Sequence, residues 1–123
     1  MKALLMLAAL CATLATARAD GGFRHVVMFK FKPEATPEQV REVERTFAEL
    51  PKKIDAIQDY EWGTSESVEG LNDGFTHCFL VTFKDKKGLE AYLPHAAHKA
   101  FGAKLRPLLE KALVFDYAAR DTP

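Results

Sequence analysis

The amino-acid sequence predicts a single α+β domain with the element order β-α-β-β-α-β. Four short segments are rich in β-branched and aromatic residues, as strands are, and two longer segments carry apolar residues at helical spacing. The chain has 123 residues, which is room for one domain with its own hydrophobic core.

The first predicted strand covers residues 23–32, with the sequence FRHVVMFKFK. One face of this strand places His25 among aromatic and apolar side chains. The other face is apolar only in its middle, at Val26 and Met28. Because both faces are partly apolar, we expect other parts of the protein to cover each of them.

The first predicted helix follows Thr36, a good N-cap, with Pro37 at the first helical position and Gln39 three residues after the cap. We expect Pro51 to end this helix. Its apolar residues recur at helical spacing and predict an amphipathic helix lying on a sheet: Val40, Val43, Phe47 and Leu50.

The middle of the chain predicts a strand at residues 57–66, turn chemistry at 69–74 and a further strand at 76–83. On this last strand Cys78 alternates with His77. We therefore expect the Cys78 side chain to pack towards the helices as a small hydrophobic group.

A helical region is predicted for residues 86–112, broken near Pro94, and a final strand for residues 113–118. This order of elements is that of the ferredoxin-like fold, in which both helices cover one face of an antiparallel sheet. The opposite face would be bare and apolar, which usually marks an interface. We therefore expect a homodimer, in which two such faces pack together into a dimeric α/β barrel.

The N-terminus has the order of a secretory signal peptide: Lys2, an uncharged stretch of mainly Ala and Leu, and small residues on both sides of Arg18. This predicts a signal peptide at residues 1–19 and a mature domain at residues 20–123, secreted or periplasmic. The stretch is shorter than the roughly 20 residues of a spanning helix, although an uncleaved membrane anchor is the alternative. Cleavage leaves Cys78 as the only cysteine, so an intrachain disulfide cannot form.

The charge balance argues against nucleic acid as a partner. Basic and acidic side chains number 17 each, and signal cleavage would remove Lys2 and Arg18 from the basic set. No basic stripe is left to neutralise phosphates. Residues 20–123 also contain no second long hydrophobic run, so no membrane partner is expected after cleavage.

Six segments, in order along the mature domain, carry a family resemblance: HVVMFKFK (25–32), WG (62–63), FTH (75–77), AYLPHAAH (91–98), FG (101–102) and VFDY (114–117). Together they resemble the stress-responsive dimeric α/β-barrel (Dabb) family. The resemblance implies the same dimeric barrel fold.

The resemblance also implies an activity. One member of that family is a plant enzyme that cyclises a linear polyketide by an aldol reaction, with a histidine as general acid/base and a tyrosine in support. The matching positions are His98 and Tyr92. This chain departs from that enzyme at Phe47, where the enzyme has a tyrosine. Other members carry similar histidines without established catalysis.

We predict that all four histidines line one cavity, with His98 and Tyr92 as the catalytic residues. Imidazole titrates near neutrality and can both take and return a proton. A tyrosine hydroxyl can hydrogen-bond a carbonyl or enolate oxygen as charge develops on it. The predicted ligand is a small, largely apolar molecule with carbonyl or hydroxyl groups, and its contacts are assigned to His25, His77, His95 and Phe79.

Other interpretations of these residues stay open. Tyr92 and His98 can bind a ligand without chemistry, or only support the fold of a stress-protective oligomer. His25 and His77 can be core histidines satisfied by neighbouring groups. His95 and His98 have no carboxylate or cysteine beside them, so no metal site is predicted. No motif in the sequence calls for a cofactor.

Overall fold

The computed structural model describes residues 22–123, so the predicted signal peptide and its cleavage site lie outside the described residues. The elements in chain order are β1 (Phe23–Phe31), α1 (Pro37–Lys53), β2 (Ile57–Thr64), β3 (His77–Phe83), α2 (Lys86–Tyr92), α3 (Ala96–Leu105), the short 3-10 helix η1 (Arg106–Leu108) and β4 (Leu109–Ala118).

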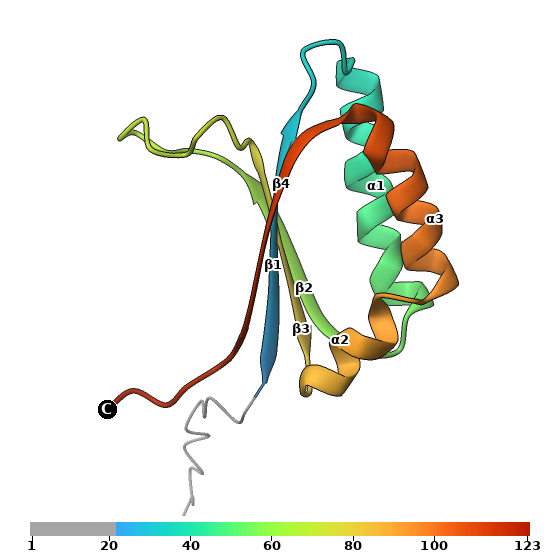
Figure 1. Ribbon diagram of the computed structural model, residues 1–123, viewed down its shortest axis with the longest axis vertical. Coiled ribbons are helices and arrows are strands. Elements are labelled where there is room, and N and C mark those ends of the chain that lie inside the picture. The colour runs from blue at the N-terminus through green and yellow to red at the C-terminus, as the bar shows by residue number, and fades with distance from the viewer. Residues whose placement is uncertain (1–21) are drawn as a thin grey trace, which may run out of the picture.

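The four strands form one antiparallel sheet in the order β2-β3-β1-β4. The helices of residues 22–123 all lie on one side of this sheet (Figure 1). This confirms the predicted ferredoxin-like α+β fold. We call the side that faces the helices the inner face and the opposite side the outer face.

The hydrophobic core lies between the inner face and the helices, and phenylalanine rings dominate it. Phe47 of α1 and Phe79 of β3 stack with ring centroids 4.3 Å apart and planes 1° apart. Phe101 of α3 meets Phe47 edge-on at 4.9 Å, so the two main helices share one aromatic cluster with the sheet. Full burial of one such side chain stabilises the folded state by about 1.5–3 kcal/mol.

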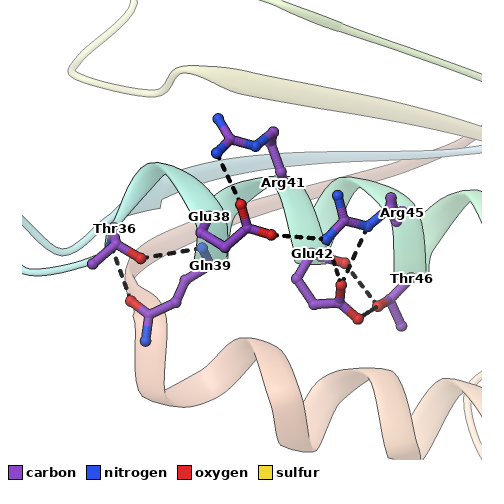
Figure 2. Close-up of polar contacts among 7 residues, drawn as sticks. All are labelled: Thr36, Glu38, Gln39, Arg41, Glu42, Arg45 and Thr46. Carbon is purple, nitrogen blue, oxygen red and sulfur yellow. Dashed lines mark hydrogen bonds and ion pairs between the residues drawn. The ribbon is translucent and has the colours of Figure 1, made fainter.

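The start of α1 agrees with the sequence prediction. The backbone N–H of Gln39 donates to the Thr36 hydroxyl at 3.2 Å, and the Thr36 N–H donates to the Gln39 side chain at 2.9 Å (Figure 2). These two bonds satisfy donors that the first turn of a helix cannot satisfy itself. The exposed side of α1 then carries ion pairs among Glu38, Arg41, Glu42 and Arg45.

The predicted end of this helix at Pro51 is wrong, because α1 continues to Lys53. A proline removes its own N–H from the helical ladder and its ring crowds the carbonyl four residues before it, but the N–H groups after it can still bond. The N–H of Ile54 still donates to the Leu50 carbonyl at 2.9 Å. Both of these side chains are buried, and their packing holds the last turn in place.

The predicted helical region is wrong at its C-terminal end. The chain breaks near Pro94 as expected, but β4 begins at Leu109, four residues before the predicted strand. Leu109 pairs with Phe31 of β1, and Ala112 pairs with Phe29. Residues 109–112 (LEKA) favour a helix by composition, so pairing with the central strand overrides their local preference.

The outer face is apolar and uncovered. Leu113 and Phe115 of β4 are 40% and 58% exposed, and they pair with Met28 and Val26 of β1. Cys78 also lies on this face, opposite Met28, so the prediction that it packs towards the helices is wrong. Its neighbours on β3 occupy the inner face, and side chains along a strand alternate.

Candidate functional site

One row of side chains crosses the inner face from edge to edge. The strand register pairs Tyr60 of β2 with Val81 of β3, Val81 with His25 of β1, and His25 with Asp116 of β4. Directly paired residues of antiparallel strands lie on the same face. These four side chains therefore share one row, and Tyr92 lies above it because its ring meets the His25 ring edge-on at 5.6 Å.

His25 is held by its partner on the edge strand. Its ring is buried, and its Nδ1 lies 2.5 Å from Oδ1 of Asp116. A carboxylate only accepts hydrogen bonds, so Nδ1 carries the proton and donates it. This partner agrees with the interpretation of His25 as a core histidine satisfied across the strands.

Tyr92 and His98 come together although they belong to different helices. The chain turns at Leu93 and Pro94, so that α2 ends at Tyr92 and α3 begins at Ala96. The two rings then lie 4.4 Å apart, centroid to centroid. The Tyr92 side chain is almost fully buried, with 1% of its surface exposed, whereas His98 is partly exposed.

A backbone contact fixes the tautomer of His98. Its Nδ1 lies 2.9 Å from the carbonyl oxygen of Leu93. Because a carbonyl only accepts, Nδ1 must carry the hydrogen in this contact. Within residues 22–123 the Nε2 of His98 has no hydrogen-bond partner. The neutral ring therefore presents an unprotonated nitrogen that can accept a proton.

The surroundings favour the neutral form of both groups. Burial lowers the pKa of His98 below its ordinary 6.5; the bond to Leu93 opposes this change, and the nearby His25 adds to it. Burial also raises the pKa of the Tyr92 hydroxyl, and Tyr60 contributes to that rise. At neutral pH His98 is therefore a free base and Tyr92 keeps its hydroxyl proton.

His95 caps the helix that carries His98. The N–H of Ala97 donates to Nδ1 of His95 at 3.0 Å, which makes His95 the N-cap of α3. This contact occupies the ring nitrogen nearest the backbone. The backbone N–H of His95 also donates to the Tyr92 carbonyl at 3.1 Å, so His95 helps to hold the turn between the two helices.

His77 lies in a different cluster on the inner face. Its Nε2 donates to Oε1 of Glu44 at 2.9 Å, and its Nδ1 lies 2.8 Å from the Thr76 hydroxyl. The Trp62 ring stacks on it at 6.2 Å, with planes 8° apart. Phe79, which was assigned a ligand contact, is fully buried in the aromatic core.

The structure therefore brings together Tyr92, His98 and His25, but it does not place all four histidines around one cavity. Sequence reasoning missed three residues of these clusters, namely Asp116, Glu44 and Tyr60. Asp116 had a visible signal, since it is a lone carboxylate within the apolar strand segment LVFDYA. No such signal pointed to Glu44 or Tyr60, because the hydrogen bond of Glu44 to His77 and the stacking of Tyr60 on Phe47 depend on the packing of α1 against the sheet.

A groove of about 600 Å³ lies on the outer side, beneath the β2–β3 connection that projects away from the helices (Figure 1). Met28, Cys78 and Leu113 line it together with the loop, and of the predicted site residues only His77 contributes to its lining. Residues 22–123 hold no group of three or more potential metal ligands. Nor does any helix among them have the length and apolar character needed to cross a membrane.

Comparisons with known proteins agree with this fold. The chain is 35% identical over 99 residues to stress-response A/B barrel domain-containing protein HS1 of Arabidopsis thaliana, covering 80% of this chain and 91% of that protein. It is 36% identical over 97 residues to olivetolic acid cyclase of Cannabis sativa, covering 79% of this chain and 96% of the cyclase.

Among solved structures, a dimeric ferredoxin-like protein of unknown function from Thermobifida fusca superposes with a TM-score of 0.70 at 26% identity. The match covers 80% of this chain and 91% of that one. The sequence model of the family described as "Stress responsive A/B Barrel Domain" matches residues 23–119, which is nearly all of the described chain. The chain therefore belongs to the stress-responsive A/B barrel domain family.

Proposed function

We propose that this protein binds a small, largely apolar carbonyl compound and acts on it as a cyclase or lyase, with His98 as general base. One observation carries the proposal: the contact between His98 Nδ1 and the Leu93 carbonyl leaves Nε2 unprotonated in a ring whose pKa burial has lowered. A base of this kind is matched to proton removal near neutral pH.

The first step is removal of a proton from the carbon beside the carbonyl group. Nε2 of His98 takes this proton, and the electron pair of the broken C–H bond moves to the carbonyl oxygen as an enolate. The Tyr92 hydroxyl, held protonated by burial, donates a hydrogen bond to that oxygen. In a cyclisation the enolate carbon attacks a second carbonyl, and His98 returns its proton to the new alkoxide.

The relationship to olivetolic acid cyclase supports this reaction class, since 97 residues align at 36% identity and cover nearly all of the cyclase. The ring contact between Tyr92 and His98, at 4.4 Å, supports it independently of that relationship. The two groups are close enough to act on one functional group.

The test is deuterium uptake at the methyl group of acetophenone in D₂O, followed by NMR. This probe has one carbonyl and one kind of exchangeable carbon, so uptake reports enolisation alone. We expect the protein to accelerate uptake and His98→Asn to return the rate to background. General-base catalysis contributes about 10²–10⁴-fold, which sets the size of the loss.

His95→Asn is the matched control, because the same substitution is made three residues away. Asn is a strong N-cap residue, so α3 keeps its cap in this variant. We expect it to retain most of the rate. Full activity in His98→Asn removes the catalytic role, and no uptake with the unmodified protein favours a non-catalytic, stress-protective or ligand-binding oligomer.

We further propose that two copies associate through their outer faces and that the chain is exported after signal cleavage. The uncovered apolar surface of β4 supports the first proposal, as does the dimeric state of the Thermobifida fusca relative. Light scattering after gel filtration should show a homodimer that Phe115→Asp dissociates. Leu93→Asp, a comparably exposed position on the helical side, should leave it intact.

Export has its own test. Intact mass of the protein purified from its own host should correspond to residues 20–123. Retention of residues 1–19 would contradict it.

A further inference from the structure

The hydroxyl of Tyr60 is buried, yet it has no hydrogen-bond partner among residues 22–123. Its ring is held in place, because it stacks on Phe47 with centroids 5.4 Å apart and on Phe79 at 6.5 Å. Buried polar groups nearly always have a partner, and a tyrosine hydroxyl can both donate and accept. The lack of a hydrogen-bond partner for the Tyr60 hydroxyl therefore needs a physical explanation.

Tyr60 belongs to the same part of the molecule as the candidate site. It lies two strands away from His25 on the inner face, with Val81 between them. Two strand spacings place the two backbones about 10 Å apart. Tyr92 lies over the same row, since its ring contacts that of His25, and Tyr60 is close enough to raise the Tyr92 pKa.

A trapped water is a poor candidate for the missing partner. A buried water needs two to four polar contacts. The Tyr60 ring is stacked on phenylalanine rings, and the one charged group that acts on its hydroxyl is the Glu44 carboxylate, which also accepts a hydrogen bond from His77. An oxygen atom on an otherwise apolar molecule satisfies the hydroxyl without requiring further polar groups.

We propose that Tyr60 is a ligand-binding residue of the His98 and Tyr92 site, and that its hydroxyl bonds a second oxygen of the ligand. This inference rests on the proposed function. It narrows the ligand class to carbonyl compounds that carry another hydroxyl or carbonyl oxygen, remote from the carbonyl that reacts. A flat, unsaturated body matches the aromatic rings that hold Tyr60.

The test compares acetophenone with its three monohydroxy isomers, substituted at the 2, 3 or 4 position of the ring. NMR titration gives each dissociation constant for the unmodified protein, Tyr60→Phe and Tyr117→Phe. The last is a control on the outer face of β4. We expect at least one isomer to bind about 3- to 10-fold more tightly than acetophenone, the effect of one hydrogen bond.

This gain should vanish in Tyr60→Phe and persist in Tyr117→Phe, while acetophenone itself binds all three proteins equally. If no isomer shows a gain that depends on Tyr60, the inference is overturned while the proposed function stands. If acetophenone does not bind the unmodified protein, the proposed function fails and the inference falls with it.

Thermal unfolding provides a readout that needs no ligand. Tyr60→Phe removes a hydroxyl without a protein partner, so the unfolding midpoint should be unchanged or higher. A fall of more than about 4 °C, the size expected for losing one hydrogen bond in a domain of this length, would show that the hydroxyl is already satisfied. That result overturns the inference whatever the titrations give.

Discussion

His77 and His98 both lie in the layer between sheet and helices, but they differ in how their ring nitrogens are used. His77 is buried, and both of its nitrogens are engaged, by Glu44 and Thr76. His98 is partly exposed, and among residues 22–123 only its Nδ1 is engaged, by a backbone carbonyl. The first histidine is thus tied to a carboxylate of α1, and the second keeps a free nitrogen next to Tyr92.

This difference separates a structural histidine from one available for chemistry. A ring with both nitrogens bonded links the elements that hold its partners, and any proton transfer would break a bond. A ring with one bonded nitrogen is held in a fixed orientation, and its other nitrogen is still available to accept a proton. We therefore expect substitutions around His98 to affect activity more than stability, and substitutions of His77 to affect stability more than activity.

The largest expected effect is the loss of enolisation rate when Tyr92, the neighbour of His98, is changed. Tyr92→Phe removes the proposed hydrogen bond to the enolate oxygen and should lower the rate of deuterium uptake by about 10²-fold or more. Tyr117→Phe, which removes a hydroxyl from the outer face, should leave the rate unchanged. Equal rates in all three proteins would show that Tyr92 has no part in the reaction.

Substitution of His77 should reduce the stability of the fold. His77→Ala leaves the partly buried Glu44 carboxylate without its partner and should lower the free energy of unfolding by about 2–3 kcal/mol. His98→Ala should cost less than about 1 kcal/mol, because one bond at a partly exposed site is lost. Urea denaturation measures both values, and equal losses would erase the distinction between the two histidines.

The loss of the α3 N-cap should lower the free energy of unfolding by an amount between those expected for His77→Ala and His98→Ala. His95→Ala should lower the free energy of unfolding by about 1 kcal/mol, because the N–H of Ala97 loses its acceptor. His95→Asn restores an N-cap side chain and should recover most of that loss. A similar loss in both variants would mean that the His95 ring contributes by something other than capping.

The finest test is the pH dependence of uptake. The proposed role of His98 requires its neutral form, and burial lowers its pKa below the ordinary 6.5. The rate should therefore decline with falling pH, with a midpoint below pH 6.5. Acid should also destabilise the fold at this position, because the unfolded imidazole binds a proton more readily. A midpoint at or above 6.5 contradicts the effect of burial.

The sequence was sufficient for features that depend on local patterns. Alternating apolar residues located β1 and β3, and the Thr36 to Gln39 box located the start of α1. It was not sufficient where distant pairing decides. Residues 109–112 have a helical composition but join β1, and Cys78 could not be assigned to a face before it was known which side the helices cover.

The residues of the candidate site also differ in whether the sequence could predict them. The resemblance to a family indicated His98 and Tyr92, and the structure places their rings in contact. The partners that distinguish one histidine from another, such as Asp116 for His25, come from strand register across most of the chain. Spacing along the sequence carries no information on such contacts.

The strand order also dictates when folding can happen. The central strand β1 has β3 and β4 as its neighbours, and β4 is the last element of the chain. His25 meets Asp116 across 91 residues of sequence. Such a high contact order means that the N-terminal half gains little from folding before synthesis is complete. The four-stranded sheet therefore cannot be completed until the last strand, β4, has been synthesised.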